Sequence, residues 1–285
     1  MLKRLVVAVS NPEFRVDQLL NLIAYSGVSE IALVHCVESV LSTPARDQAL
    51  ANRAREKLNR RVAEAADHTD ISLHAEVHIG IPAQQIIQAA TEFAANTIAI
   101  GAFIGIPRQE LFLGSTALEI VRYAQTDVLV VHLTPELQYV VGGLQRPLLD
   151  DVLFPTDFSD FSMAAFDDFL GLADRQLRHV TLLHIQDVTH IDPHLMDRLP
   201  EFDARDEQRL QNMAQSLTAR GVEVDYRIQL AVPEQSIIRT ALELDVSCIA
   251  IGSRGRTITD GPPWGSVSER VVRRADAPVL VIKAV

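Results

Sequence analysis

Gly252-Ser-Arg-Gly-Arg-Thr-Ile-Thr-Asp-Gly-Pro-Pro-Trp-Gly-Ser266 is the most informative stretch of this chain. The apolar run Val246–Ile251 precedes it and predicts a buried strand, whereas Val267–Arg274 follows it and predicts an amphipathic helix. Glycines therefore stand at a strand end and at a helix start. Glycine lets a ligand approach the backbone closely, and a helix N-terminus offers unpaired N–H donors and a partial positive charge. Together these features predict a binding place for an anion such as phosphate.

A second interpretation of this stretch is that Gly252, Gly255 and Gly261 only punctuate a surface loop. The spacing matches neither familiar glycine loop, because the chain contains no G-x-G-x-x-G and no G-x-x-x-x-G-K-[ST]. Its own pattern is Gly, two residues, Gly, nine residues and then Gly-Ser, which places Gly265 and Ser266 at the start of the predicted helix.

Length and composition indicate a globular α/β protein. The chain has 285 residues, enough for two domains of roughly 140 residues each. Hydrophobic residues make up 48% and charged residues 22%, which is ordinary for a protein with a sizeable core. The net charge of −11, with no basic stripe, argues against nucleic acid and an anionic membrane surface as partners.

Targeting signals and cysteines favour a cytoplasmic location. The apolar part of the N-terminus is short and predicts a first strand rather than a signal peptide. No apolar run approaches the ~18 residues of a membrane span. Cys36 and Cys248 both lie in apolar strand runs of different halves, so we expect buried thiols rather than a disulfide, which suits a reducing compartment.

Strand and helix patterns alternate along the first half of the chain. Proline at position 82 fits the first turn of a helix, where its missing N–H costs nothing. This alternation predicts a parallel sheet with helices on both faces. The expected strands are Leu5–Val9, Glu30–Val37, Ile71–Ile79, Thr97–Gly101 and Asp127–His132, and the expected helices cover about 13–26 and 45–67 and begin at Pro82 and near 115.

The pattern then repeats. Pro233-Glu-Gln-Ser-Ile-Ile follows Pro82-Ala-Gln-Gln-Ile-Ile at an offset of 151, which holds without a gap to the last strand. The matches along it include Ile98-Ala-Ile-Gly101 with Ile249-Ala-Ile-Gly252, Gly114-Ser115 with Gly265-Ser266, and Val128-Leu-Val130 with Val279-Leu-Val281. Such a match indicates a duplicated domain. We expect domains at 1–134 and 148–285, joined by a linker with Pro135, Gly142, Gly143 and Pro147 as breakers.

The repeat unit resembles the universal stress protein family, and nearly the whole chain resembles a tandem member of it. Two motifs carry the resemblance: the first strand Val152-Leu-Phe-Pro-Thr-Asp157 that ends in Asp, and the glycine pattern described above. The resemblance implies two doubly wound α/β domains, each a five-stranded parallel sheet in the order 3-2-1-4-5. It also implies binding of ATP, or of ADP or AMP, with Mg²⁺ as an optional partner.

The resemblance also implies which residues would form the nucleotide site of the second half. Asp157 should reach the ribose or a phosphate-bound metal, and Thr156 and Ile185 should flank the adenine, with Ile251 below it. Ligands of doubly wound folds bind at the carboxyl ends of the strands, in agreement with this placement. The full set of expected ligand-binding residues is Pro155, Thr156, Asp157, Ile185, Ile251, Gly252, Ser253, Arg254, Gly255, Gly265, Ser266 and Val267.

Each half departs from the family pattern. In the second half, Asp260-Gly-Pro-Pro-Trp264 brings a negative charge and two prolines without N–H donors close to the expected phosphates, which favours ADP or AMP over ATP. In the first half, Ser10 stands in the place of Asp157 and Ile104 in the place of Gly255. We therefore expect the first half to be degenerate and nucleotide binding to belong to the second.

Other polar residues have simpler interpretations. His35 and His184 end the second strands and are expected to serve packing, and His74 and His78 stand ~13 Å apart along one strand, too far for one metal. His190-x-Asp-x-His194 is expected to be an exposed loop. Arg254 and Arg256 either clamp phosphate or are solvated charges. The stretch from Pro200 to Glu207 predicts the start of a solvated helix.

Three functions remain open from the sequence. The first is a cytoplasmic ATP-binding regulatory module with one nucleotide site and an unknown protein partner. The second is a slow ATPase, for which only Asp157 and Asp260 are available as a general base. The third is a nucleotide-free dimeric scaffold. We expect a homodimer, or an internal pseudo-dimer in which Asp127–His132 and Pro278–Lys283 pair.

Overall fold

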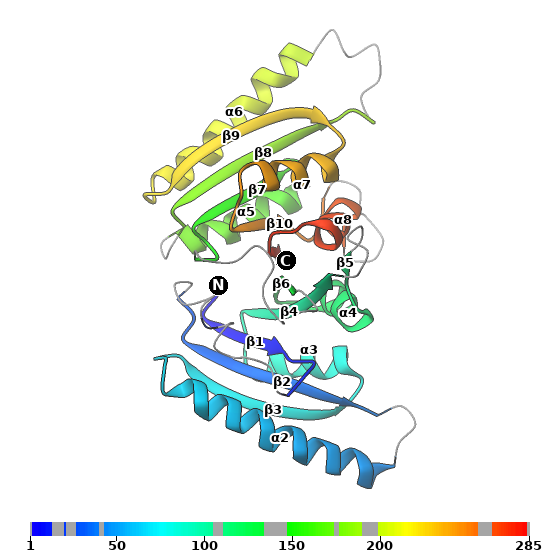
Figure 1. Ribbon diagram of the computed structural model, residues 1–285. Helices are drawn as coiled ribbons and strands as arrows, with labels where there is room; N and C mark the ends of the chain where they lie inside the picture. The colour runs from blue at the N-terminus through cyan, green and yellow to red at the C-terminus, as the bar shows by residue number, and fades with distance from the viewer. Residues whose placement is uncertain are drawn as a thin grey trace. The chain divides into compact units, whose positions relative to one another are not determined.

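The computed structural model describes residues 2–12, 20, 27–39, 43–104, 111–133, 147–173, 177–189, 199–255 and 264–283. The chain forms two compact units, Met1–Pro147 and Leu148–Val285. Within each unit, five strands pair in parallel (Figure 1).

The sheet of the first unit has parallel strands in the order β3-β2-β1-β4-β6. A short sixth strand, β5, pairs antiparallel with the end of β4. The described elements are β1 (Arg4–Ala8), β2 (Glu30–Glu38), α2 (Pro44–Ala66), β3 (Ser72–Gly80), α3 (Pro82–Glu92), β4 (Thr97–Ile104), β5 (Leu111–Phe112), α4 (Ser115–Tyr123) and β6 (Asp127–Leu133).

The second unit repeats this order as β9-β8-β7-β10-β11, and all its strands are parallel. Its elements are β7 (Asp151–Thr156), α5 (Asp160–Ala173), β8 (His179–Asp187), α6 (Leu199–Thr218), β9 (Glu223–Ala231), α7 (Pro233–Glu243), β10 (Cys248–Gly252), α8 (Ser266–Arg274) and β11 (Val279–Ile282). The expected order 3-2-1-4-5 is therefore confirmed in both units.

Helices cover both faces of each sheet because the strands are apolar on both sides. Every residue of β10 is buried, as expected for a central strand of a doubly wound sheet. In the second unit α5 contacts α6, and α7 contacts α8, and the two pairs cover opposite faces (Figure 1). Phe154 of β7 packs against Phe166 and Phe169 of α5, with ring centroids 5.4 and 5.0 Å apart.

Element starts follow the sequence signals closely. Pro82 and Pro233 occupy the first turns of α3 and α7, as expected for a residue without an N–H donor. The strand β5 was not expected, because a two-residue strand has no periodicity to detect. The helix expected at about 13–26 and the loop at His190 to His194 lie largely or wholly outside the described residues.

Both cysteines are free thiols, as expected, although only Cys248 is fully buried and Cys36 is half-buried. Burial raises the pKa of the Cys248 thiol to about 12, so this group is an uncharged part of the core. Among the described residues, no helix is both long and apolar enough to cross a membrane.

Candidate functional site

The candidate site forms where two neighbouring parallel strands of the second unit, β7 and β10, end side by side. Asp157 directly follows β7, and Gly252 is the last residue of β10. In a doubly wound sheet these carboxyl ends point toward the same edge, where such folds bind ligands. The fold therefore brings together the two motifs that are almost 100 residues apart in the sequence.

The Asp157 carboxylate is held in one orientation beside the glycine loop. Its Oδ1 accepts hydrogen bonds from the backbone N–H and the hydroxyl of Ser159, at 3.0 and 2.6 Å. Its Oδ2 faces Gly255, because a Cβ placed on Gly255 would lie 2.9 Å from this oxygen. A side chain at position 255 would therefore have to displace the carboxylate, so the glycine and the Asp expected from the sequence are a matched pair.

The start of α8 completes this arrangement. The N–H of Gly265 donates to the carbonyl of Ser253 at 2.8 Å, which folds the loop back onto the end of β10. A Cβ on Gly265 would lie 3.7 Å from the backbone nitrogen of Gly255, so the two glycines are close neighbours. No side chain caps this helix end, where Gly265 is the N-cap. We refer to Asp157, Gly255, Gly265 and the N-terminal N–H groups of α8 as the cradle.

Ser268, in the first turn of α8, ties the cradle to the sheet. Its hydroxyl donates to the carbonyl of Gly252 at 2.7 Å, and the residue is 6% exposed. The first unit has Ala117 at the matching position, at the same offset of 151 that relates the two halves. Ser268 was not among the predicted site residues, although the sequence alone shows this difference between the two halves.

The other expected site residues surround the cradle to different degrees. Ser266 is exposed, and Val267, Arg254 and Ile185 are half-buried, whereas Pro155, Thr156, Ile251, Gly252 and Ser253 are buried. The guanidinium of Arg254 lies over the ring of Phe161, 5.4 Å from its centroid. Arg256 and Asp260 lie outside the described residues.

Thr156 has an internal role that the sequence did not reveal. Its hydroxyl pairs with the hydroxyl of Ser162 at 3.0 Å and accepts a hydrogen bond from the N–H of Phe158 at 3.1 Å. Its carbonyl contacts Nδ1 of His184 at 2.9 Å. Thr156 therefore shapes the turn that carries Asp157, and its polar atoms are already paired within the protein.

The first unit has a different backbone at the matching place. Strand β4 continues past Gly101 as far as Ile104, where it pairs with Leu111 of β5. In the second unit β10 ends at Gly252, and the next residues form the loop of the cradle. The position that matches Gly255 is thus part of a strand pair in the first unit, and Ser10 replaces Asp157 there.

Helix α6 contributes two acidic residues that the sequence analysis had assigned to a solvated face. Asp206 Oδ2 lies 3.3 Å from Nε2 of His184 and accepts a hydrogen bond from Gln186 at 3.1 Å. Asp203 accepts a second hydrogen bond from the same amide at 3.0 Å. That assignment was wrong for Asp206, whose side chain is only 13% exposed, because helical spacing alone does not reveal which strand end a helix faces. Asp203 is exposed, as expected.

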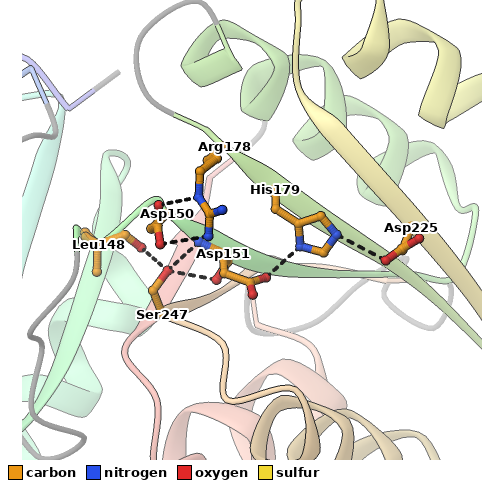
Figure 2. A network of polar contacts seen from close by, with 7 residues as sticks. All are labelled: Leu148, Asp150, Asp151, Arg178, His179, Asp225 and Ser247. Atoms are coloured by element: carbon orange, nitrogen blue, oxygen red, sulfur yellow. Dashed lines mark hydrogen bonds and ion pairs between the residues drawn. The ribbon is translucent and has the colours of Figure 1, made fainter.

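A second polar cluster lies at the opposite, N-terminal ends of β7 and β8 (Figure 2). Nδ1 of His179 contacts Asp151 at 2.9 Å, and Nε2 contacts Asp225 at 3.3 Å. Burial lowers the pKa of the His179 imidazole, but hydrogen bonds and charge attraction from both carboxylates outweigh this effect, so the net pKa is raised. Beside it, Arg178 donates to Asp150 at 2.8 Å.

The remaining histidines of the sequence analysis have local partners. His78 contacts Glu76 at 3.0 Å, and His74 contacts Ser72 at 3.2 Å, both within β3. His35 contacts the carbonyl of Val9 at 2.8 Å, as His184 contacts that of Thr156. No group of three or more possible metal ligands occurs in the part of the chain that the structure describes.

Comparison with known proteins agrees with the fold. The model of the family described as "Universal stress protein family" matches residues 1–132 and again residues 149–283. The chain belongs to the universal stress protein family. The two matches confirm that it contains two universal stress domains in tandem.

Individual relatives share about a quarter of their residues with this chain. The universal stress protein MJ0577 of Methanocaldococcus jannaschii is 26% identical over 151 residues, which cover 46% of this chain and 93% of that protein. A universal stress protein of Mycolicibacterium smegmatis is 26% identical over 240 residues, 82% of this chain and 76% of the relative.

A solved structure matches both domains at once. The crystal structure of a universal stress protein from Archaeoglobus fulgidus covers 100% of this chain and 100% of its own, with a TM-score of 0.78 and 22% sequence identity. At this identity the likeness concerns the fold, and it agrees with the two-domain arrangement.

Proposed function

We propose that this chain is a regulatory universal stress protein that binds one adenine nucleotide at the cradle of its second unit. The observation that carries the proposal is that Asp157, Gly255 and Gly265 lie together at an uncapped helix N-terminus. A helix N-terminus of this kind attracts phosphate through its N–H groups and its dipole. Nucleotide would then act by favouring one conformation of the protein over another.

The residues present fit a nucleotide. The N–H of Gly265 is bound to the carbonyl of Ser253, so phosphate would meet the N–H groups of Gly255 and of the first turn of α8. The exposed Ser266 adds a hydroxyl at the helix start. Asp157 is placed to meet the ribose or a phosphate-bound Mg²⁺ ion. The half-buried Ile185, at the end of the neighbouring strand β8, would cover one side of the adenine, with Ile251 below it.

Binding is favoured over hydrolysis by the state of Asp157. A slow ATPase would need a general base beside the terminal phosphate. Oδ1 of Asp157 already accepts two hydrogen bonds from Ser159, which hold the carboxylate in place and occupy this oxygen. We propose ATP, ADP and AMP as candidate ligands, whose affinities should be compared. The proposed cytoplasmic location rests on the free thiols of Cys36 and Cys248.

The proposal is tested first on the purified full-length protein. Denaturing it and passing the supernatant over an anion-exchange column would release a carried adenine nucleotide. Isothermal titration with ATP and Mg²⁺ would then be compared for the wild type, Asp157→Ala and Ser10→Ala. We expect Asp157→Ala to lose binding and Ser10→Ala to retain it, because Ser10 occupies the matching place in the first unit. A wild type that neither carries nor binds nucleotide would instead favour a nucleotide-free scaffold.

A further inference from the structure

Phe158, the residue after Asp157, has an unusual backbone conformation. Its φ is 58°, in the left-handed region that side chains with a Cβ rarely adopt. The other two non-glycine residues with positive φ among those described are Ala94 and Asp245. These two match each other at the offset of 151 and follow the ends of α3 and α7, so they belong to the repeated fold. Phe158 has no such counterpart, because Asn11 stands at its place in the first unit.

The ring of Phe158 holds this unfavourable conformation in place. It lies against the ring of His184, with centroids 4.3 Å apart and an interplanar angle of 32°. The guanidinium carbon of Arg209, on α6, lies 5.1 Å from the centroid of the same ring. The backbone N–H of Phe158 donates to the hydroxyl of Thr156 at 3.1 Å. Three separate elements therefore fix one turn.

His184 connects this turn to α6. Nδ1 contacts the carbonyl of Thr156 at 2.9 Å, and Nε2 contacts the carboxylate of Asp206 at 3.3 Å. A carbonyl is an acceptor, so Nδ1 carries the hydrogen in this contact. Phe158 thus contacts the imidazole ring of His184 and the guanidinium of Arg209, and aromatic rings attract cations such as guanidinium across their faces.

Comparison with the first unit shows which contacts of this network are common to both units and which occur only beside the cradle. His35 contacts the carbonyl of Val9 at 2.8 Å, just as His184 contacts that of Thr156. The histidine–carbonyl contact is therefore common to both units. The aromatic residue at 158 with its left-handed φ is specific to the unit that carries the carboxylate of Asp157.

We propose that Phe158 is a positioning residue for the nucleotide, which through its contacts with His184 and Arg209 directs the Asp157 carboxylate toward Gly255. This inference rests on the proposed nucleotide site. Asp157 lies between Thr156 and Phe158, both of which are anchored, and its Oδ2 faces the place where Gly255 has no Cβ. If the turn relaxed to an ordinary φ, the carboxylate would no longer be held against the glycine loop.

The test compares three substitutions of Phe158 in the full-length chain. Trp264 is the single tryptophan and stands next to Gly265, so its fluorescence would report titration with ATP and Mg²⁺. Phe158→Leu removes the aromatic face and should weaken binding by ~10-fold or more, the effect expected from misplacing one charged contact. Phe158→Tyr keeps the ring and should restore wild-type affinity. Asn11→Leu is the matched control in the first unit and should leave affinity unchanged.

Phe158→Gly distinguishes positioning from a merely structural role. Glycine accepts a φ of 58° without strain, so this variant should unfold at a urea concentration no lower than that of Phe158→Leu. Its affinity should nevertheless be as weak as that of Phe158→Leu, because glycine adopts ordinary φ values equally well and no contact with His184 and Arg209 then holds the turn. If the nucleotide affinities of the three variants instead rank in the same order as their urea midpoints, the inference is overturned.

A double-mutant cycle tests whether Phe158 acts through the histidine. Asp206→Asn alone should weaken binding, and its effect should largely disappear in the Phe158→Leu background, because both changes release the same turn. Effects that simply add, or a Phe158→Leu variant that binds as tightly as the wild type, contradict the inference. Failure of the wild type itself to bind ATP, ADP or AMP would instead overturn the proposed function.

Discussion

At the scale of single residues, the cradle depends on the absence of one side-chain atom. A Cβ on Gly255 would lie 2.9 Å from Asp157 Oδ2, closer than such atoms approach one another. We predict that Gly255→Ala displaces the carboxylate and weakens nucleotide binding by ~10-fold or more, equivalent to ~1.4 kcal/mol or more. Isothermal titration with ATP and Mg²⁺ measures the change.

The chain provides a matched control for this substitution. Gly114 stands at the start of α4, at the place that Gly265 occupies in the second unit, and a Cβ there would meet no atom within 4 Å. Gly114→Ala should therefore leave nucleotide affinity unchanged. Equal affinity of Gly255→Ala and the wild type would mean that Asp157 and Gly255 do not act as a pair.

The raised pKa of His179 predicts that the stability of the second unit depends on pH. Its pKa is raised above the ordinary value of 6.5 in the folded state, so protonation favours folding. This contribution is fully present below pH 6.5, the unfolded value, and is lost as the pH rises through the higher folded value. We therefore expect the urea midpoint of the second unit to decrease as the pH rises from about 6 to about 8. The substitution His179→Asn should make this decrease smaller.

The first unit contains the corresponding control. At the matching strand positions Arg4 and Glu30 form an ion pair of 3.2 Å that contains no histidine. Arg4→Gln should lower the urea midpoint slightly and by a similar amount at both pH values, since exposed pairs contribute little. A pH slope unaffected by His179→Asn would assign the dependence to other groups.

At the scale of elements, the apolar strand runs and the offset of 151 were sufficient to predict two repeated α/β domains, and the resemblance to the family supplied the strand order. It also identified Asp157, Gly255 and Gly265, which the structure places together. It could not identify β5, whose two residues have no periodicity. Nor could it identify the contact of Asp206 with His184, because this depends on how α6 packs on β8 rather than on local spacing.

Helix α8 is connected to β10 by a buried side-chain hydrogen bond that can be removed. The hydroxyl of Ser268 donates to the carbonyl of Gly252 at 2.7 Å. Ser268→Ala should lower the free energy of unfolding by ~1 kcal/mol, and by up to ~3 kcal/mol if the carbonyl stays unpaired. It should also weaken nucleotide binding, because the helix start is less firmly held.

The comparison for Ser268 is Ser216, a half-buried serine that makes a similar bond within its own helix. Ser216 on α6 donates to the carbonyl of Asn212 at 3.2 Å within its own helix. Ser216→Ala should change stability by less than ~0.5 kcal/mol, as is usual for surface substitutions. Urea denaturation followed by circular dichroism measures both variants, and equal effects would mean that the Gly252 contact contributes no more than a surface bond.

At the scale of the whole molecule, we expect two chains to associate. Symmetric dimers are the commonest assembly of soluble proteins, and each universal stress domain presents helical faces that could form such an interface. Light scattering at tens of micromolar should return a mass near twice the 31.5 kDa of one chain. A mass equal to that of a single chain would count against this prediction.

The duplication predicts how many nucleotides one chain binds. The two units share strand order, but the first continues β4 to Ile104 and pairs it with Leu111 where the second opens the loop of the cradle. To form a nucleotide site of the same kind, the first unit would have to lose this strand pair and replace Ser10 with Asp. Isothermal titration of the full chain should therefore give one ATP per chain, and Asp157→Ala should abolish it. A stoichiometry of two ATP molecules per chain would mean that the first unit also binds nucleotide. So would one ATP molecule that still binds to the Asp157→Ala variant.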